Sequence, residues 1–303
     1  MQELIQDAIK LTGRYASEGS PAEYLSTLSD GDFSQFGICL TDCLGNTYAG
    51  GDSNFLFSIQ SVIKVLILAA ALQDSGLEKL HKAVRFEPTG DSFNSILRHE
   101  DATQRPFNPM INAGTFAAIS VVAGNAETRF GKVLSLLRQM ADDDSIDYDR
   151  GIYQAEYISG DRNRSLAYIL RSGGIFKDSV DEILDVHFKT SSILVNCVHL
   201  SRIGAVLAND GISPLTGRLI LRSEHARLIR TVMATCGLYD GSGEFAVSVG
   251  IPAKSGVSGD IMASVKNKAG IGVYSPALDP NGNSVCGMKA IQYLAEQLNL
   301  AIY

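Results

Sequence analysis

The chain has no block of basic residues and no arginine-rich stripe along its 303 positions. Its 26 lysines and arginines are outnumbered by 33 aspartates and glutamates, which gives a formal net charge of −7 at pH 7. Proteins that bind nucleic acid or an anionic membrane surface concentrate positive charge in a patch or a stripe. The composition therefore predicts neither kind of partner.

Long apolar runs are also missing. The longest, near 65–72 and 116–123, fall short of the roughly 20 residues that span a bilayer, so we interpret them as buried helices. The first ten residues, MQELIQDAIK, include acidic side chains and no long apolar core, unlike a secretory signal. A cytoplasmic location is the resulting prediction.

Cysteines are few and widely scattered. The chain has five, an odd number, and they form no Cys-x-x-Cys pair. Neither a disulfide framework nor a zinc site is indicated by this spacing. We expect buried thiols in a reducing compartment and no bound metal or organic cofactor. The cysteines are Cys39, Cys43, Cys197, Cys236 and Cys286.

The chain shows no internal repeat, low-complexity tract or flexible linker. Hydrophobic periodicity predicts helices and strands in a definite order. In the first part we expect helices over 3–17 and 21–29, a β-hairpin over 37–51 and a helix from 57 to 72. In the last part we expect strands over 245–256, 260–267 and 269–276, a turn at Asn267-Lys268 and a helix over 286–299.

This order predicts an α/β protein of the α+β kind, in which an antiparallel sheet is flanked by helices. The two ends of the chain, 1–74 and 236–303, would build the lobe that contains the sheet. The stretch 75–235 would form an inserted helical lobe. Both lobes would make one catalytic unit, with the site between them.

Ser61 and Lys64 are three residues apart at the start of the apolar run. Positions i and i+3 of a helix lie on one face, so the hydroxyl and the amine can meet. An amine that loses its proton can activate a serine without a histidine. Ser-x-x-Lys is the signature of β-lactamases and penicillin-binding proteins.

Lys254, Ser255 and Gly256 form the second element of the same pattern, a Lys-Ser/Thr-Gly triplet on a strand near the end of the chain. Alone, the triplet would be read as a turn. With the serine helix upstream and a helical segment between them, the catalytic interpretation is favoured. The two elements together predict a fold like that of the β-lactamases and penicillin-binding proteins.

Several segments strongly resemble the serine-dependent glutaminases over nearly the whole chain, in that family's order and spacing. The resemblance implies a β-lactamase-like fold, hydrolysis of L-glutamine to L-glutamate and ammonia without a cofactor, and a homodimer or homotetramer. The segments are FSIQSVIK (57–64), GDSFNSI (90–96), PFNPMINAG (106–114), EYISGDRNRSLAY (156–168), VDEILDVHF (180–188), TCGLYDGSGEFA (235–246) and PAKSGVSG (252–259).

The resemblance also implies roles for individual residues. Ser61 would be the nucleophile and Lys64 the general base, with Tyr239 and His187 beside them. Lys254, Ser255 and Gly256 would support the site. The residues placed to bind substrate are Tyr24, Gln60, Asn112, Glu156, Asn163, His187, Tyr239 and Val257.

The chemistry requires these residue types. Lys64 can take the serine proton only if burial lowers its pKa by several units. The backbone N–H groups of Ser61 and Val257 would form an oxyanion hole. Glu156 suits the ammonium of a free amino acid, while asparagine and tyrosine side chains suit its carboxylate and amide. No arginine falls in the set, unlike the usual carboxylate clamp.

His187 is a departure, because the family usually has tyrosine there. It could act as a proton carrier with an ionisation near pH 6–7, or fill the space in a slower enzyme. Two alternatives to a glutaminase therefore stay open: a glutamine-binding protein with reduced or lost catalysis, and a β-lactam-interacting hydrolase of the same fold. Against the hydrolase, the chain lacks a Ser-Asp-Asn loop and carries Glu156 where a drug carboxylate would be repelled.

Overall fold

The computed structural model describes residues 1–21, 34–89 and 105–302. A five-stranded antiparallel sheet forms one layer, with strand order β2-β1-β7-β6-β5. The hairpin and the late strands thus join in one sheet, as predicted from their alternating apolar residues. The strands are β1 (Gly37–Asp42), β2 (Thr47–Gly51), β5 (Ala253–Ser255), β6 (Asp260–Val265) and β7 (Ala269–Tyr274).

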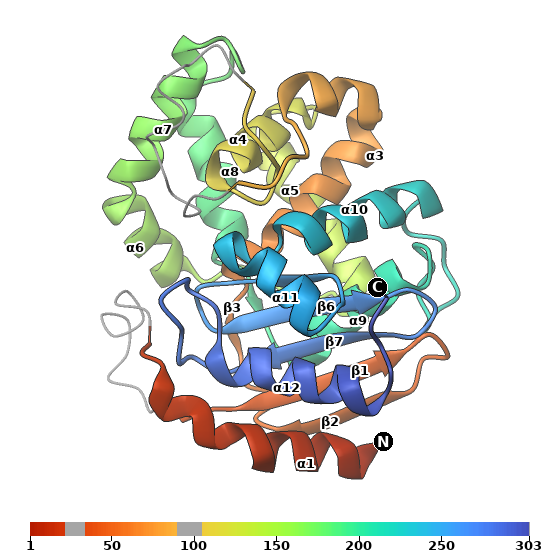
Figure 1. Ribbon diagram of the computed structural model, residues 1–303. Coiled ribbons are helices and arrows are strands. Elements are labelled where there is room, and N and C mark those ends of the chain that lie inside the picture. The colour runs from red at the N-terminus through yellow and green to blue at the C-terminus, as the bar shows by residue number, and fades with distance from the viewer. Residues whose placement is uncertain (22–33, 90–104, 303) are drawn as a thin grey trace.

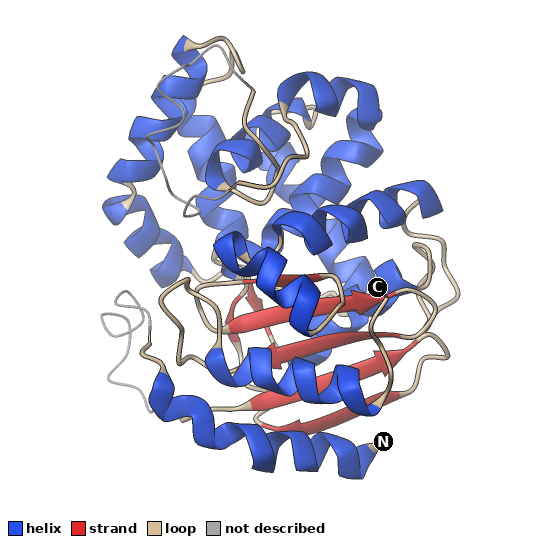
Figure 2. Cartoon of the chain, viewed as in Figure 1, coloured by secondary structure: helices blue, strands red, loops and turns tan. Residues whose placement is uncertain are grey.

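Helices cover both faces of this sheet (Figures 1 and 2). On one face, α1 (Gln2–Thr12) and α12 (Val285–Gln297) pack side by side, with α11 (Ser242–Ser248) above them. Their apolar residues and those of the strands form one buried cluster. The other face is covered by α9 (Cys197–Ala208), which packs closely on β1, β6 and β7.

Two glycines of β7 allow α9 to approach so closely. A Cβ atom at Gly270 would lie 2.1 Å from the backbone nitrogen of Ala205, and one at Gly272 would lie 2.3 Å from the carbonyl oxygen of Cys197. Although α9 lies within the stretch 75–235, it therefore packs on the sheet.

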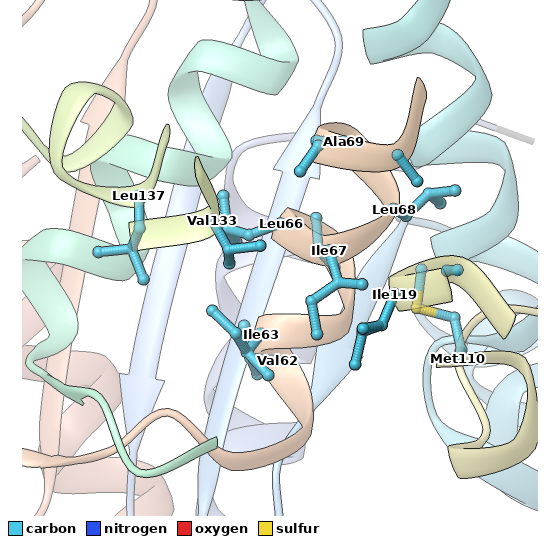
Figure 3. Packing of buried hydrophobic residues seen from close by; sticks show 14 of the residues in the cluster. Val62, Ile63, Leu66, Ile67, Leu68, Ala69, Met110, Ile119, Val133 and Leu137 are labelled. Atoms are coloured by element: carbon cyan, nitrogen blue, oxygen red, sulfur yellow. The ribbon is translucent and has the colours of Figure 1, made fainter. Parts of the chain in front are cut away.

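The remaining helices form the lobe at the top of Figure 1. Its centre is α3 (Ile63–Ala83), which contacts α4 and α5 through an apolar cluster shown in Figure 3. The other helices that complete the lobe and its connection to the sheet are α4 (Asn112–Val121), α5 (Ala126–Ala141), α6 (Arg150–Ser159), α7 (Asp161–Ser172), α8 (Val180–Ser191) and α10 (Ser223–Cys236).

Short elements position the start of α3. Strand β3 (Phe57–Ser58) pairs with β4 (Leu194–Val195), and the 3-10 turn η2 (Gln60–Val62) leads into α3. Two further 3-10 turns, η1 (Gly13–Glu18) and η4 (Tyr239–Gly241), follow α1 and precede α11. The helical run Gln60–Ala83, which is kinked at Gly76, is long and apolar enough to cross a membrane by length and composition, but 67% of its most apolar window is buried inside the protein.

The strand predicted over 245–256 is wrong for its first half. Residues Ser242–Ser248 form α11, and the strand covers only Ala253–Ser255. In a strand, Phe245, Val247 and Val249 would share one face. Here Phe245 and Val249 are buried while Val247 is 89% exposed, which is the i, i+4 pattern of a helix.

The predicted turn at Asn267-Lys268 is confirmed, since Asn267 joins β6 to β7 with a φ of 60°. The C-terminal helix is confirmed within two residues of its predicted bounds. The helix predicted over 21–29 and the segment 90–96 lie largely or wholly outside the described residues.

Candidate active site

Ser61 lies in the 3-10 turn η2 that leads into α3, and Lys64 follows three residues later as the second residue of α3. The Lys64 Nζ donates a hydrogen bond to Ser61 Oγ at 2.9 Å. Lys64 is only 1% exposed, whereas Ser61 is partly exposed and lines a pocket. The predicted pairing of hydroxyl and amine on one helix face is therefore present.

Burial changes the chemistry of this amine. Desolvation lowers the pKa of Lys64 from 10.5 to about 7, although the negative charge of Glu156 opposes the shift. A substantial fraction of Lys64 is therefore neutral at neutral pH and able to accept a proton. This is the property that a serine paired with a lysine requires.

The pocket beside Ser61 is a cavity of about 200 Å³ between the sheet lobe and the helical lobe. It brings together seven of the predicted site residues, from five different parts of the chain. These are Gln60, Ser61, Asn112, Glu156, Asn163, His187 and Val257. Asn112 Nδ2 donates to Asn163 Oδ1 at 2.9 Å, so the two amides form one polar wall.

Glu156 is held at both carboxylate oxygens. Gln60 Nε2 donates to Oε1 at 2.6 Å, and Ser191 Oγ donates to Oε2 at 2.8 Å. Burial raises the pKa of the Glu156 carboxyl, while these two hydrogen bonds and Lys64 oppose the rise. The pocket therefore presents an oriented, partly desolvated carboxylate that suits a cationic group.

Tyr239, Lys254, Ser255 and Gly256 lie next to Ser61 without lining the pocket. The Tyr239 hydroxyl hydrogen-bonds with the Ser61 side chain and donates to the Ser255 carbonyl at 3.4 Å. Lys254 Nζ lies 4.2 Å from the centre of the Tyr239 ring. Burial raises the pKa of Tyr239 and lowers that of Lys254.

Lys254 connects strand β5 to the segment before Tyr239 by two hydrogen bonds. Its Nζ donates to the carbonyl oxygens of Gly237 and Ser255, at 2.9 and 2.6 Å. The residue is fully buried. Lys254 thus links the end of β5 to the segment that carries Tyr239.

His187 lines the pocket, but it is only 6% exposed. Its ring packs edge-on against Phe116 at 5.0 Å, and its Nδ1 has no hydrogen-bond partner in the described parts of the chain. Burial, assisted by the charge of Lys64, lowers the pKa of His187 to about 3. The imidazole is therefore neutral near pH 7, and the expected ionisation of His187 near pH 6–7 is not supported.

Two backbone donors border the pocket, the N–H groups of Ser61 and Val257. Ser61 stands at a helix N-terminus, where N–H groups are free. Val257 follows β5 and lines the same pocket. Both are thus available to an anion that forms there.

Sequence reasoning missed Ser159, Gly160, Phe188 and Ser191, which also line the pocket. Ser191 could have been found, because it follows His187 by four residues on α8 and so shares its face. Gly160 had no such signal. A Cβ there would lie 2.5 Å from Phe188 Cζ and 2.8 Å from the Glu156 carbonyl oxygen. Tyr24 lies outside the described residues.

Within the described ranges, no three histidine, cysteine, aspartate or glutamate side chains form a group that could hold a metal ion.

Comparison with known proteins shows the family to which the chain belongs. The model of the family described as Glutaminase matches residues 19–303. A Clostridium tetani protein called glutaminase is 43% identical over 305 residues, covering 100% of both chains. A Clostridioides difficile glutaminase is 42% identical over 304 residues, covering 100% of this chain and 98% of its own.

Solved structures are similar over the same extent. A Bacillus glutaminase determined in 4.3 M NaCl is 34% identical, with a TM-score of 0.92 and 99% of each chain covered. A probable glutaminase from Bacillus subtilis complexed with 6-diazo-5-oxo-L-norleucine is 31% identical, with a TM-score of 0.89, covering 98% of this chain and 94% of its own. On the family match and these full-length relatives, the chain belongs to the glutaminase family.

Proposed function

We propose that this protein hydrolyses L-glutamine to L-glutamate and ammonia through an acyl-enzyme on Ser61. The observation that carries the proposal is the buried Lys64 amine, 2.9 Å from Ser61 Oγ and with a pKa of about 7, in a chain of the glutaminase family. A neutral amine in that position can remove the serine proton as the hydroxyl attacks an amide.

The first half-reaction forms an ester. Ser61 Oγ bonds to the side-chain amide carbon of glutamine, and its proton moves to Lys64. The carbonyl oxygen becomes negative and accepts hydrogen bonds from the Ser61 and Val257 N–H groups. The C–N bond then breaks, and the proton returns from Lys64 to the leaving nitrogen, which departs as ammonia. Tyr239, hydrogen-bonded to Ser61, would share in this proton transfer.

The second half-reaction releases glutamate. Lys64 takes a proton from water as the water oxygen attacks the ester carbon. The same two N–H groups stabilise the oxyanion, and Ser61 Oγ leaves with the proton that Lys64 returns. Losing one oxyanion donor in such a site typically lowers the rate by about 10²–10³-fold.

Binding of a free amino acid follows from the polar wall of the pocket. Glu156, held by Gln60 and Ser191, would accept hydrogen bonds from the substrate ammonium. Asn112 and Asn163 would bind the substrate carboxylate and amide as neutral donors. His187 would contact the substrate as a neutral imidazole, because its pKa lies near 3.

The test is ammonia release from L-glutamine by purified wild type, Ser61→Ala and Ser120→Ala. Ser120 is a suitable control because its half-buried hydroxyl donates to the Ala117 carbonyl on α4, away from the lining of the pocket. We expect turnover by wild type and Ser120→Ala and none by Ser61→Ala, with EDTA without effect. Glutamine binding without ammonia release would support a binding protein, and nitrocefin hydrolysis a β-lactam hydrolase.

The quaternary structure and location are also proposals. We propose a homodimer or homotetramer in the cytoplasm, on the family resemblance and the sequence features given above. Light scattering of the purified protein measures the mass in solution, and a monomer at micromolar concentration would contradict the proposed assembly.

A further inference from the structure

Asp260 is a fully buried carboxyl at the start of β6, directly after the turn that carries Val257. Its Oδ1 accepts a hydrogen bond from Ser258 Oγ at 2.5 Å. Its backbone carbonyl accepts one from the Gly256 N–H at 2.8 Å, and Gly259 N–H donates to the Gly256 carbonyl at 3.1 Å. Main chain and side chain of Asp260 thus close the turn of residues 256–260 from the inside.

The carboxyl also packs directly against the backbone at the start of the turn. A Cβ atom at Gly256 would lie 2.0 Å from Asp260 Oδ1. No side chain could share that space, so the third position of the Lys-Ser-Gly triplet is filled by the Asp260 carboxyl. The residue next to Gly256 is Val257, whose N–H is one of the two proposed oxyanion donors.

The surroundings of Asp260 include few charges. Lys254 on β5 is the cation near it, and it lowers the carboxyl pKa, while Tyr239, Tyr274 on β7 and Cys197 on α9 are the other titratable groups whose pKa values respond to its charge. Oδ2 has no hydrogen-bond partner within the described residues. A buried carboxyl satisfied at one oxygen destabilises a fold, and such groups concentrate at functional sites.

We propose that Asp260 is a positioning residue that holds the 256–260 turn so that the Val257 N–H points into the pocket. The inference rests on the proposed amide hydrolysis. Asp260 does not itself line the pocket; it acts through Gly256 and Ser258. Burial raises the pKa of its carboxyl to about 7, so the charge that holds Ser258 is partly lost just below neutral pH.

The kinetic test compares Asp260→Asn with Asp42→Asn. Asp42 is a matched control, because its carboxylate also closes a turn of the same sheet by accepting from Leu44 N–H and Asn46 N–H, each at 2.9 Å. In the register of the sheet Asp42 lies opposite Ala269 at one end of β7, and Asp260 lies opposite Tyr274 at the other end. The two aspartates are therefore far apart along the sheet. We expect kcat to fall about tenfold in Asp260→Asn, less than complete loss of an oxyanion donor, with KM nearly unchanged and Asp42→Asn like wild type.

The pH dependence gives a readout that a purely structural role would not move. In wild type Lys64 and Asp260 both lose a proton near pH 7. Because a neutral side chain at position 260 is expected to lower kcat about tenfold, log kcat should rise more steeply near pH 7 than it would for Lys64 alone. In Asp260→Asn only Lys64 remains, and the rise should be that of a single ionisation. An unchanged kcat and an unchanged slope would overturn the proposal.

Amide hydrogen exchange tests the same inference without relying on turnover. We expect the amides of residues 256–259 to exchange faster in Asp260→Asn than in wild type and Asp42→Asn. If wild type failed to hydrolyse glutamine, the proposed function would be wrong. Faster exchange in Asp260→Asn would still support the inference that Asp260 holds the 256–260 turn. If Asp260→Asn does not fold, Ser258→Ala can replace it, because that variant removes only the hydrogen bond to Asp260 Oδ1. Exchange rates and a kcat equal to those of wild type in Ser258→Ala would contradict the inference.

Discussion

Gln60 Nε2 donates a hydrogen bond to Glu156 Oε1 at 2.6 Å, which joins the turn before the proposed nucleophile to a helix 96 positions later in the chain. Gln60 has a φ of 41°, a left-handed value that costs a non-glycine residue roughly 1–3 kcal/mol. The hydrogen bond compensates part of this strain. The turn that presents Ser61 and the carboxylate proposed to bind the substrate ammonium are therefore fixed as one unit.

Gln60→Ala and Gln60→Gly should separate the hydrogen bond from the strain. Both remove the donor to Glu156, so both should raise KM for glutamine by a similar factor, about tenfold for one lost charge-assisted hydrogen bond. Glycine adopts positive φ without penalty, so Gln60→Gly should be the more stable of the two by about 1 kcal/mol. Steady-state kinetics and thermal unfolding measure the two effects; a KM unchanged in both variants would show that Gln60 does not orient Glu156.

Glu156→Gln should raise KM for glutamine by orders of magnitude. It removes the proposed partner of the substrate ammonium, and breaking a buried charge pair typically costs about 3–5 kcal/mol. N-acetylglutamine, which has no ammonium, should be a poor substrate of the wild type. Kinetics with both substrates check this role, and efficient turnover of N-acetylglutamine by the wild type would contradict it.

A control for Glu156→Gln is Ser191→Ala. It keeps the Glu156 charge and removes only the hydrogen bond to Oε2, so its KM should rise less. Glu156→Gln should also move the acid limb of the pH profile to lower pH, because the Glu156 charge raises the pKa of Lys64. An acid limb at the same pH in both variants would mean that this limb does not belong to Lys64.

Lys64 should make activity rise as pH rises through about 7, because only its neutral amine can accept the Ser61 proton. The same shift affects stability. The folded pKa lies below the ordinary 10.5, so between about pH 7 and 10.5 the unfolded chain binds one more proton. Stability contributed by this group therefore rises with pH across that window. Lys64→Met should lose activity and make this rise smaller in thermal unfolding measured against pH, while Lys254, whose pKa burial also lowers, keeps part of it. A rise as steep as that of wild type would assign all of it to another group.

Local patterns predicted the parts of the site that depend on neighbouring residues. The i, i+3 spacing of Ser61 and Lys64 was enough to predict their contact, and alternation located the strands at 260–265 and 269–274. Alternation failed at Phe245, Val247 and Val249, because the same three residues fit a strand or one helical turn. Burial of Phe245 and Val249 against the sheet decides between these structures, and that contact is not encoded locally.

Contacts made across the fold were beyond local reasoning. The convergence of Asn112, Glu156 and Asn163 on one pocket was implied only by the family resemblance. The hydrogen bond from Ser191 to Glu156 and the packing of Asp260 on Gly256 had no sequence signal that singled them out. Burial also set the pKa of His187, since a histidine in a sequence gives no measure of its desolvation.

His187 should leave the pH profile near neutrality unchanged, because burial and Lys64 hold its pKa near 3. The acid limbs of wild type, His187→Tyr and His187→Phe should therefore share one midpoint. Their kcat values should differ. With Nδ1 buried and unpartnered in the described structure, Nε2 is the nitrogen that can reach a bound molecule. Phenylalanine keeps the ring and removes that nitrogen, while tyrosine restores a donor.

We expect kcat to fall in His187→Phe and to equal or exceed the wild-type value in His187→Tyr. Stability supplies an independent check. Since the folded pKa lies below the ordinary 6.5, the unfolded chain binds one more proton between about pH 3 and 6.5, and stability contributed by His187 is lost as pH falls through that window. Both variants should weaken this acid sensitivity in thermal unfolding. A wild-type kcat in His187→Phe would show that the imidazole only fills space, and Tyr239, hydrogen-bonded to Ser61, would then carry the proton transfer alone with Lys64.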